Sequence, residues 1–288
     1  MSKFLLFTVL LLACQKEPDA SILEVPVTVT PEGFAATPQV IALKNGMIVE
    51  ASGMADSKRH AGYLWVQEDS GNPPAIYLLK HDGTIADTVL LEGAVNRDWE
   101  DMVLAGDQLY IGDIGDNNAE ATSCRFYRFA EPARGVKKTS SFDVIEFRYP
   151  DGAHDAEAFL VDPGTKDIYV FTKRDAASKV FKLPYPQSTT SMNVAVPVRD
   201  LDYTGVVSAA LSPDGKEFIL KTYTRLYYYT KRASDAIPSV LGNKPVTLAY
   251  LPEMQGEAVA FRADNKGFYT LSERAFNVDP SLRYYQRQ

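Results

Sequence analysis

The chain has 288 residues, and 45% of them are hydrophobic, including 16 tyrosines and 14 phenylalanines, which is enough apolar material for one large domain or two ordinary ones. Its formal net charge of −7 excludes a protein that binds nucleic acid regardless of sequence, because no basic excess is present to neutralise phosphates. The acidic balance favours a cation or a sugar as partner.

The first thirteen residues, MSKFLLFTVLLLA, carry one lysine followed by a short apolar run. The run is too short to span a bilayer as a helix and is typical of a signal peptide. Its end, Leu11-Leu12-Ala13-Cys14, resembles the lipobox of bacterial lipoproteins, although Leu12 is bulkier than usual at that position. We therefore expect a signal peptide over 1–13, a lipid on Cys14 and a flexible tether over 14–24.

A lipid on Cys14 places the protein at a membrane of the bacterial cell envelope, on the extracytoplasmic side. The alternative is ordinary secretion with Cys14 in a disulfide, for which Cys124 is the available partner. If Cys14 is lipidated, Cys124 is expected to be a free, buried thiol that packs as a small hydrophobic residue.

Short runs rich in Val, Ile, Tyr and Phe fill most of the remaining chain, separated by turn signals such as HDG, DPGT, SPDGK and ADNKG. Five copies of one pattern recur: a small or acidic residue, an apolar strand, a turn and a second, aromatic-rich strand. Two more strand-like runs follow each copy. The copies start about 50 residues apart, at Ser52, Glu100, Glu157, Val207 and Glu257.

Four strands per repeat at this period predict an all-β fold, a β-propeller of four-stranded antiparallel blades. Five blades are preferred, and six is the alternative if residues 25–45 form more than one strand. The last repeat is one strand short, so we expect a strand within EVPVTV or QVIAL to complete it and close the ring. Residues 25–288 then form a single domain.

In a propeller, the first strand of each blade lines the central channel, so equivalent residues form rings. Glu100, Glu157 and Glu257 share one repeat position. The ends of the second strands predict another ring, at the same mouth of the channel because each hairpin is antiparallel; its members are Asp69, Asp113, Lys173, Thr222 and Glu273.

This concentration of carboxylates predicts a Ca²⁺ site, since Ca²⁺ takes six to eight oxygen ligands. The expected ligands are Glu100, Asp113, Glu157 and Glu257, while Asp69, Lys173 and Glu273 are expected to contact a bound ligand. Asp98, Asp101 and Asp116 lie outside the repeat positions and are expected in loops or behind the ligands. Two alternatives stay open: a structural rim paired with Lys and Arg, or a metal-free substrate site that uses the carboxylates as acid and base.

Two other side chains are candidates for this mouth. His154 lies three residues before Glu157 and could act as a ligand or as a general acid or base. Trp99 precedes Glu100 and would either pack between blades or stack on a sugar ring. The sequence contains no Gly-x-Ser-x-Gly elbow, Walker A loop, dinucleotide fingerprint, CxxC or HExxH motif.

Six segments together resemble a group of bacterial secreted or lipid-anchored propellers related to the SdiA-regulated, phytase-esterase-like and strictosidine-synthase/paraoxonase-like families. They are EDSGNP (68–73), NRDWEDM (96–102), IGDIGDN (111–117), YPDGAHDAEAF (149–159), SPDGK (212–216) and GEAVAF (256–261). The resemblance implies a propeller with Ca²⁺ at the axial mouth and, in some members, hydrolysis of an ester, lactone or phosphoester. The segment from Val207 to Ala210 departs from the pattern because it carries no acidic residue, which leaves one ligand absent.

We therefore expect a lipid-anchored propeller that binds Ca²⁺ and presents its mouth to a small molecule, a carbohydrate or a protein, and that does not bind nucleic acid. The alternative is a metal-dependent hydrolase in which Glu157 or His154 moves the proton.

Overall fold

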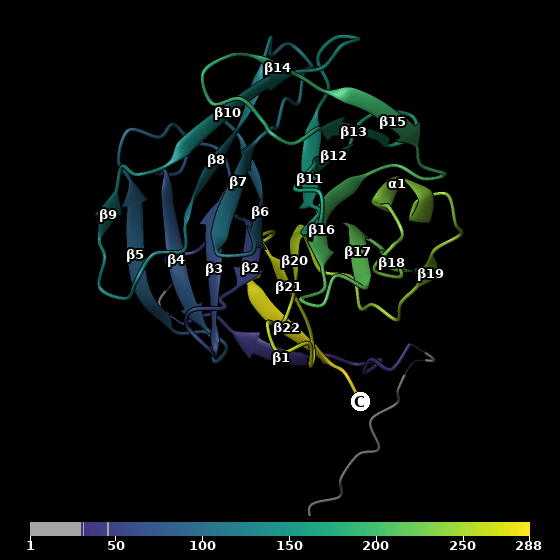
Figure 1. Ribbon diagram of the computed structural model, residues 1–288. Helices are drawn as coiled ribbons and strands as arrows, with labels where there is room; N and C mark the ends of the chain where they lie inside the picture. Colours follow the sequence, from purple (N-terminus) through teal and green to yellow (C-terminus); the bar gives the residue numbers. More distant parts are fainter. Residues whose placement is uncertain (1–29, 31, 45) are drawn as a thin grey trace, which may run out of the picture.

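The computed structural model describes residues 30, 32–44 and 46–288. The expected signal peptide and tether, as well as the segment EVPVTV, lie outside these residues. Five antiparallel sheets are arranged around a central axis (Figure 1), which confirms the predicted five-bladed β-propeller. No helix among the described residues is long and apolar enough to cross a membrane.

Each blade has four principal strands. From the axis outward, blade 1 is β2 (Ala51–Asp56), β3 (Tyr63–Glu68), β4 (Ala75–Lys80) and β5 (Ile85–Leu91); blade 2 is β6 (Trp99–Ala105), β7 (Gln108–Asp113), β8 (Cys124–Ala130) and β10 (Asp143–Arg148); blade 3 is β11 (Ala156–Val161), β12 (Ile168–Thr172), β13 (Lys179–Leu183) and β15 (Val196–Asp200); blade 4 is β16 (Val206–Leu211), β17 (Glu217–Thr222), β18 (Leu226–Thr230) and β19 (Val246–Thr247); blade 5 is β20 (Gly256–Phe261), β21 (Gly267–Ser272), β22 (Ser281–Gln286) and β1 (Gln39–Ala42).

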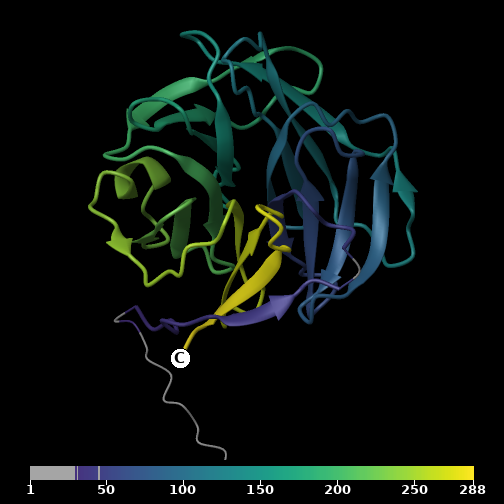
Figure 2. The same cartoon turned by 180° about the vertical axis from the view of Figure 1, so that it is seen from behind.

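The last blade is completed by a strand from the other end of the chain. β1, which lies within the segment QVIAL, pairs antiparallel with β22 (Figure 2). Just before β1, the buried ring of Phe34 inserts between blades 4 and 5, with its centroid 5.0 Å from that of Phe268 and 5.8 Å from that of Tyr228. Blade 5 is therefore held by both ends of the sequence.

Two short strands tie neighbouring blades together at their outer edges. β9 (Lys138–Thr139) leaves blade 2 and pairs parallel with β5 of blade 1, and β14 (Asn193–Val194) leaves blade 3 and pairs parallel with β10 of blade 2. Each covers an edge that would otherwise expose unpaired backbone groups.

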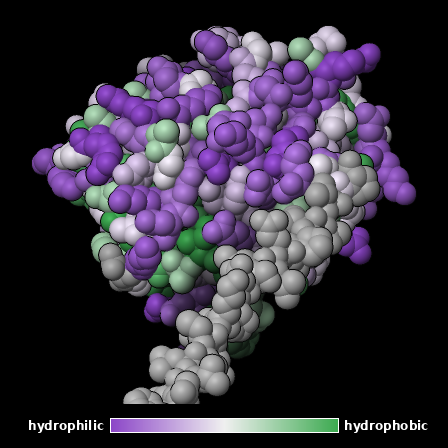
Figure 3. Space-filling view, turned by 90° about the horizontal axis from the view of Figure 1, so that it is seen from below, coloured by the Kyte–Doolittle hydropathy of each residue, from purple (hydrophilic) through white to green (hydrophobic). Residues whose placement is uncertain are grey.

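The hydrophobic core is divided among the five interfaces between neighbouring blades. In the interface between blades 2 and 3, Phe126 packs against Phe159 with ring centroids 4.8 Å apart. The short helix α1 (Ile237–Val240) adds two apolar side chains to the interface between blades 3 and 4. Hydrophilic side chains cover most of the face seen in Figure 3, in keeping with apolar groups buried between blades.

The innermost strands are buried on both faces, and they approach one another closely at the axis. A Cβ atom on Gly53 of β2 would lie 2.5 Å from the backbone nitrogen of Met102 in β6. Only glycine allows this approach, which brings the residues that precede it on each strand into one small region.

A carboxylate cluster at one mouth of the channel

All five innermost strands are interrupted at the same place. In each, the pairing with the second strand shifts at the predicted ring position, as between Ala156 and Ala158 of β11 or Gly256 and Ala258 of β20. Such β-bulges redirect side chains at the rims of barrels and next to active sites. The shifts include Ser52, Glu100, Glu157, Val207 and Glu257.

Glu100 is the centre of the cluster that results. It belongs to two groups of carboxylates, one with Asp69 and Asp98 and the other with Asp155 and Glu157, and within each group one ligand atom of each residue lies within 4.8 Å of the others. Glu100, Asp155 and Glu157 are each 4% exposed. Blades 1, 2 and 3 therefore bring five carboxylates around one point.

Lys173 supplies positive charge on the side of blades 3 to 5. Its ammonium contacts Glu157 Oε1 and lies 3.9 Å from Glu257 Oε1, and it donates to the hydroxyl of Tyr223 at 3.0 Å. The Tyr223 hydroxyl donates in turn to Glu257 Oε1. On the opposite side of the cluster, Arg174 Nε lies 2.6 Å from Asp155 Oδ2. Two cations thus make ion pairs with three of the mouth carboxylates, while Asp69, Asp98, Glu100 and Glu273 form none within the described chain.

Burial and mutual repulsion make these acids hold their protons. Burial, followed by the charge of Glu157, raises the pKa of Glu100 well above its ordinary value, and burial likewise raises the pKa of Asp98. Burial raises the pKa of Asp69 to about 6, and burial together with the neighbouring Glu257 raises the pKa of Glu273 to about 9. An added positive charge in this mouth would relieve the same repulsion.

Two features suit the cluster to a hard cation. Glu157 Oε2 is buried and accepts no hydrogen bond from any described residue. The backbone of Gly115 packs directly against two of the carboxylates, since a Cβ there would lie 2.2 Å from Glu100 Oε1 and 2.5 Å from Asp98 Oδ2. The donor set consists of oxygens alone, which suits Ca²⁺ or Mg²⁺ and disfavours zinc.

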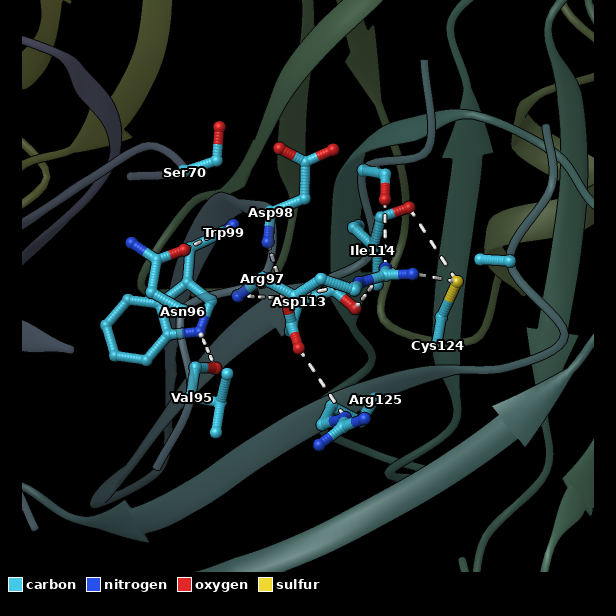
Figure 4. A network of polar contacts seen from close by, with 12 residues as sticks. Ser70, Val95, Asn96, Arg97, Asp98, Trp99, Asp113, Ile114, Cys124 and Arg125 are labelled. Atoms are coloured by element: carbon cyan, nitrogen blue, oxygen red, sulfur yellow. Dashed lines mark hydrogen bonds and ion pairs between the residues drawn. The ribbon is translucent and has the colours of Figure 1, made fainter. Parts of the chain in front are cut away.

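The predicted position of Asp113 was wrong by one residue. Asp113 pairs with Trp99 in the register in which Glu68 pairs with Ala51, one residue before the position that Asp69 occupies. Successive residues of a strand point to opposite faces, so Asp113 turns away from the cluster. Its carboxylate accepts a hydrogen bond from the backbone of Asp98 at 2.8 Å and lies 3.5 Å from Arg125 Nε (Figure 4).

The other predicted residues separate into two sets. Glu100, Glu157 and Asp69 lie in the cluster, and Lys173, Glu257 and Glu273 lie at its edge. His154 has both ring nitrogens 3.1 Å from a carboxylate outside the cluster, one from Asp151 and one from Asp175. Trp99 is fully buried, and its ring packs 5.7 Å from that of Tyr127, so it is a blade-packing residue and cannot stack on a sugar.

Two acidic residues of the cluster were not expected there. Asp98 was expected behind the ligands and Asp155 was not singled out at all, yet both lie beside Glu100. The signal was the spacing, because Asp98-Trp99-Glu100 and Asp155-Ala156-Glu157 repeat the same acid-x-Glu pattern in consecutive blades.

Asp101 closes the channel just beyond the cluster. Its buried carboxylate accepts hydrogen bonds from Ser208 Oγ at 3.1 Å and from the backbone of Ala209 at 3.0 Å, so blade 2 bonds to blade 4 across the axis. Ser208 Oγ also accepts from the backbone of Val259 in blade 5 at 3.1 Å. The cluster therefore sits in a shallow mouth with a polar floor.

Comparison with known proteins supports the fold. No protein-family model and no curated protein matches the chain. A luciferin-regenerating enzyme is similar in structure, with a TM-score of 0.51 and 9% identity over 86% of this chain and 95% of that one. The PQQ-bound aldose sugar dehydrogenase of Streptomyces coelicolor gives a TM-score of 0.46 and 11% identity over 88% and 99% of the two chains. At this identity, the first similarity describes a shared propeller architecture.

Proposed function

We propose that the mouth binds a divalent cation, Ca²⁺ in preference to others, and that the protein acts as a ligand- or partner-binding propeller. The observation that carries the proposal is the pair of carboxylate groups that share Glu100, together with the buried, unpartnered Glu157 Oε2. Asp98, Glu100, Asp155 and Glu157 would hold the cation, with Asp69 beside them.

The ligand is proposed to bind at the same mouth through oxygen atoms. Lys173 and Tyr223 present a cationic and a hydroxyl donor at the edge of the cluster, and a bound cation would attract oxygens of the ligand. A carbohydrate, a small oxygen-rich molecule or an acidic side chain of a partner protein meets this requirement. The polar floor formed by Asp101 and Ser208 restricts the ligand to the mouth.

Thermal unfolding tests the cation. Full-length protein in EDTA should unfold at a lower temperature than protein in millimolar Ca²⁺, because a ligand present at about 100 times its Kd stabilises the folded state by about 2.7 kcal/mol. Glu100→Gln should abolish the Ca²⁺-dependent rise without lowering the unfolding temperature in EDTA, since it removes a buried charge and keeps the side-chain shape.

Glu120→Gln is the matched control, because Glu120 is exposed, is adjacent in sequence to the loop that carries Gly115, and lies outside both carboxylate groups. It should retain the full rise. Equal unfolding temperatures in EDTA and Ca²⁺ for the wild-type protein would refute the cation proposal.

A metal-dependent hydrolase of an ester, lactone or phosphoester is the second candidate. It is favoured by the contact between Lys173 and Glu157, because Glu157 has a pKa raised by burial and lies beside the proposed cation. A bound cation would polarise the reacting carbonyl or phosphoryl oxygen. In this chain, Glu157 would hold or accept the proton, and Lys173 would orient it. Assays of the same proteins with nitrophenyl esters and phosphates distinguish the candidates, since Ca²⁺-dependent turnover lost in Glu100→Gln supports the hydrolase.

The proposal includes a location. A lipid on Cys14 would hold the propeller on the extracytoplasmic side of a bacterial membrane, and the lipobox-like segment before Cys14 supports this. Burial of Cys124, which is 3% exposed, makes it a poor partner for a disulfide to Cys14. Mass spectrometry of the mature N-terminus checks the modification.

A further inference from the structure

A second pocket opens on the side of blade 2, apart from the carboxylate cluster. It has a volume of about 360 Å³ and is lined by residues of two segments, 120–124 and 148–153. The first segment leads into β8 and the second leads from β10 towards β11. The pocket therefore lies where blade 2 passes into blade 3.

The wall of this pocket contains a buried hydroxyl that has no partner. Tyr149 is 6% exposed, and its hydroxyl makes no hydrogen bond to any described residue. Aromatic rings fix the side chain, since the ring of His154 lies 5.0 Å away and that of Phe181 lies 4.8 Å away. A buried tyrosine hydroxyl usually finds a partner, and leaving it unpaired costs free energy.

Arg148, beside Tyr149, also lines the pocket. Its guanidinium makes no ion pair and no hydrogen bond within the described chain, whereas ten of the other described arginines do: Arg59, Arg97, Arg125, Arg128, Arg134, Arg174, Arg232, Arg262, Arg274 and Arg287. Thr122 and Ser123 add two hydroxyls to the same wall. The pocket is rich in donors, in contrast to the carboxylate-rich mouth.

The acids closest to this pocket are already engaged. Asp116 accepts hydrogen bonds from the backbone nitrogens of Glu120 and Ala121, at 3.0 and 2.7 Å. Asp155 pairs with Arg174. Glu120 is the one carboxylate in the lining, and its residue is exposed at the rim.

We propose that this pocket binds a small organic carboxylate, with Arg148 as the counter-ion and the Tyr149 hydroxyl as a hydrogen-bond donor. Arginine matches a carboxylate with two parallel N–H donors, and the tyrosine hydroxyl supplies a third. Burial keeps the hydroxyl protonated, because it raises the pKa of Tyr149 well above its ordinary value. The site is separate from the proposed cation site and does not depend on it.

The test uses full-length protein and three probes, acetate, succinate and citrate, with sodium chloride at matched ionic strength and glycerol as comparators. At least one carboxylate should raise the unfolding temperature of the wild-type protein where the comparators do not. Calorimetry should show binding about tenfold weaker in Tyr149→Phe, which removes one hydrogen bond to a charged group and leaves the ring in place. Arg148→Gln should lose the binding.

Tyr149→Phe also separates binding from a structural role. Removing an unpaired buried hydroxyl should leave the stability of the ligand-free protein unchanged or higher, so a loss of carboxylate affinity in this variant cannot be attributed to misfolding. Because citrate chelates Ca²⁺, the measurements are made in EDTA. The proposal is overturned if no carboxylate stabilises the wild-type protein, or if both variants bind as tightly as the wild type.

Discussion

Gly115 is the residue on which the shape of the proposed cation site depends most directly, although it offers no side chain. Its backbone nitrogen donates to the carbonyl of Asp98 at 3.2 Å, and its carbonyl accepts from Arg97 Nη2 at 2.9 Å. These bonds hold the loop against Glu100 and Asp98. A methyl group at this position would overlap both carboxylates.

Gly115→Ala should therefore weaken Ca²⁺ binding by about tenfold or more, the range expected when groups that orient metal ligands are disturbed. Isothermal titration calorimetry measures the change. Gly164→Ala is the control, because the nearest atom to a Cβ there is Asp162 Oδ1 at 3.3 Å, and it should bind as the wild type does. Unchanged affinity in Gly115→Ala would place the cation away from Glu100 and Asp98.

Asp101 shows why blade 4 lacks a glutamate at the ring position. The carboxylate of Asp101 reaches across the axis to the bulge of β16, where Ser208 and Ala209 supply donors. Val207 is buried beside them. Blade 4 therefore contributes the floor of the mouth, and the apolar residue that departs from the family pattern has a structural reason.

At the scale of the element, β1 is expected to be the strand most sensitive to core truncation. Phe34 anchors the chain that enters β1, and it packs between blades 4 and 5 against Phe268 and Tyr228. Phe34→Ala should lower the free energy of unfolding by about 3–5 kcal/mol, the usual cost of emptying a buried phenylalanine site. Urea denaturation measures it.

Val40→Ala provides the comparison on β1 itself, because Val40 is 59% exposed and its truncation should change stability by less than about 0.5 kcal/mol. A small effect of Phe34→Ala would mean that the ring stays closed without this anchor.

The strands and the repeat were predictable from sequence because they rest on short-range patterns. Alternation such as that of β10, with buried Ile145 and Phe147 between exposed neighbours, marks strands directly. The bulges are not marked in this way. Asp113 was assigned by its acidity, and a slip of one residue exchanged the two faces of β7 at that point.

The partners of the cluster depend on contacts across the axis, which a single sequence does not encode by spacing. Glu157 and Glu100 were predicted to meet because they share a repeat position, and they do. The bonds from Asp101 to Ser208, more than a hundred residues apart, and the packing of Gly115 on Glu100 follow from how five blades close into a ring.

At the scale of the whole molecule, the acidic mouth should make stability depend on pH. The pKa of Asp69 rises to about 6 and that of Glu273 to about 9 on folding, from about 3.9 and about 4.3 in an unfolded chain. A carboxyl whose pKa is raised binds its proton more tightly in the folded state. Its contribution to stability is complete below the unfolded pKa and is lost as pH rises through the folded pKa.

In EDTA, the unfolding temperature should therefore fall as pH rises from about 6 to about 9, and millimolar Ca²⁺ should reduce the fall because a bound cation replaces the protons that the cluster loses. Glu273→Gln should flatten the decline in EDTA, since the amide does not titrate. Glu92→Gln, at an exposed surface pair with Lys138, should follow the wild-type curve. A wild-type unfolding temperature that stays constant from pH 6 to 9 in EDTA would contradict the raised pKa values and, with them, the repulsion that the cation is proposed to relieve.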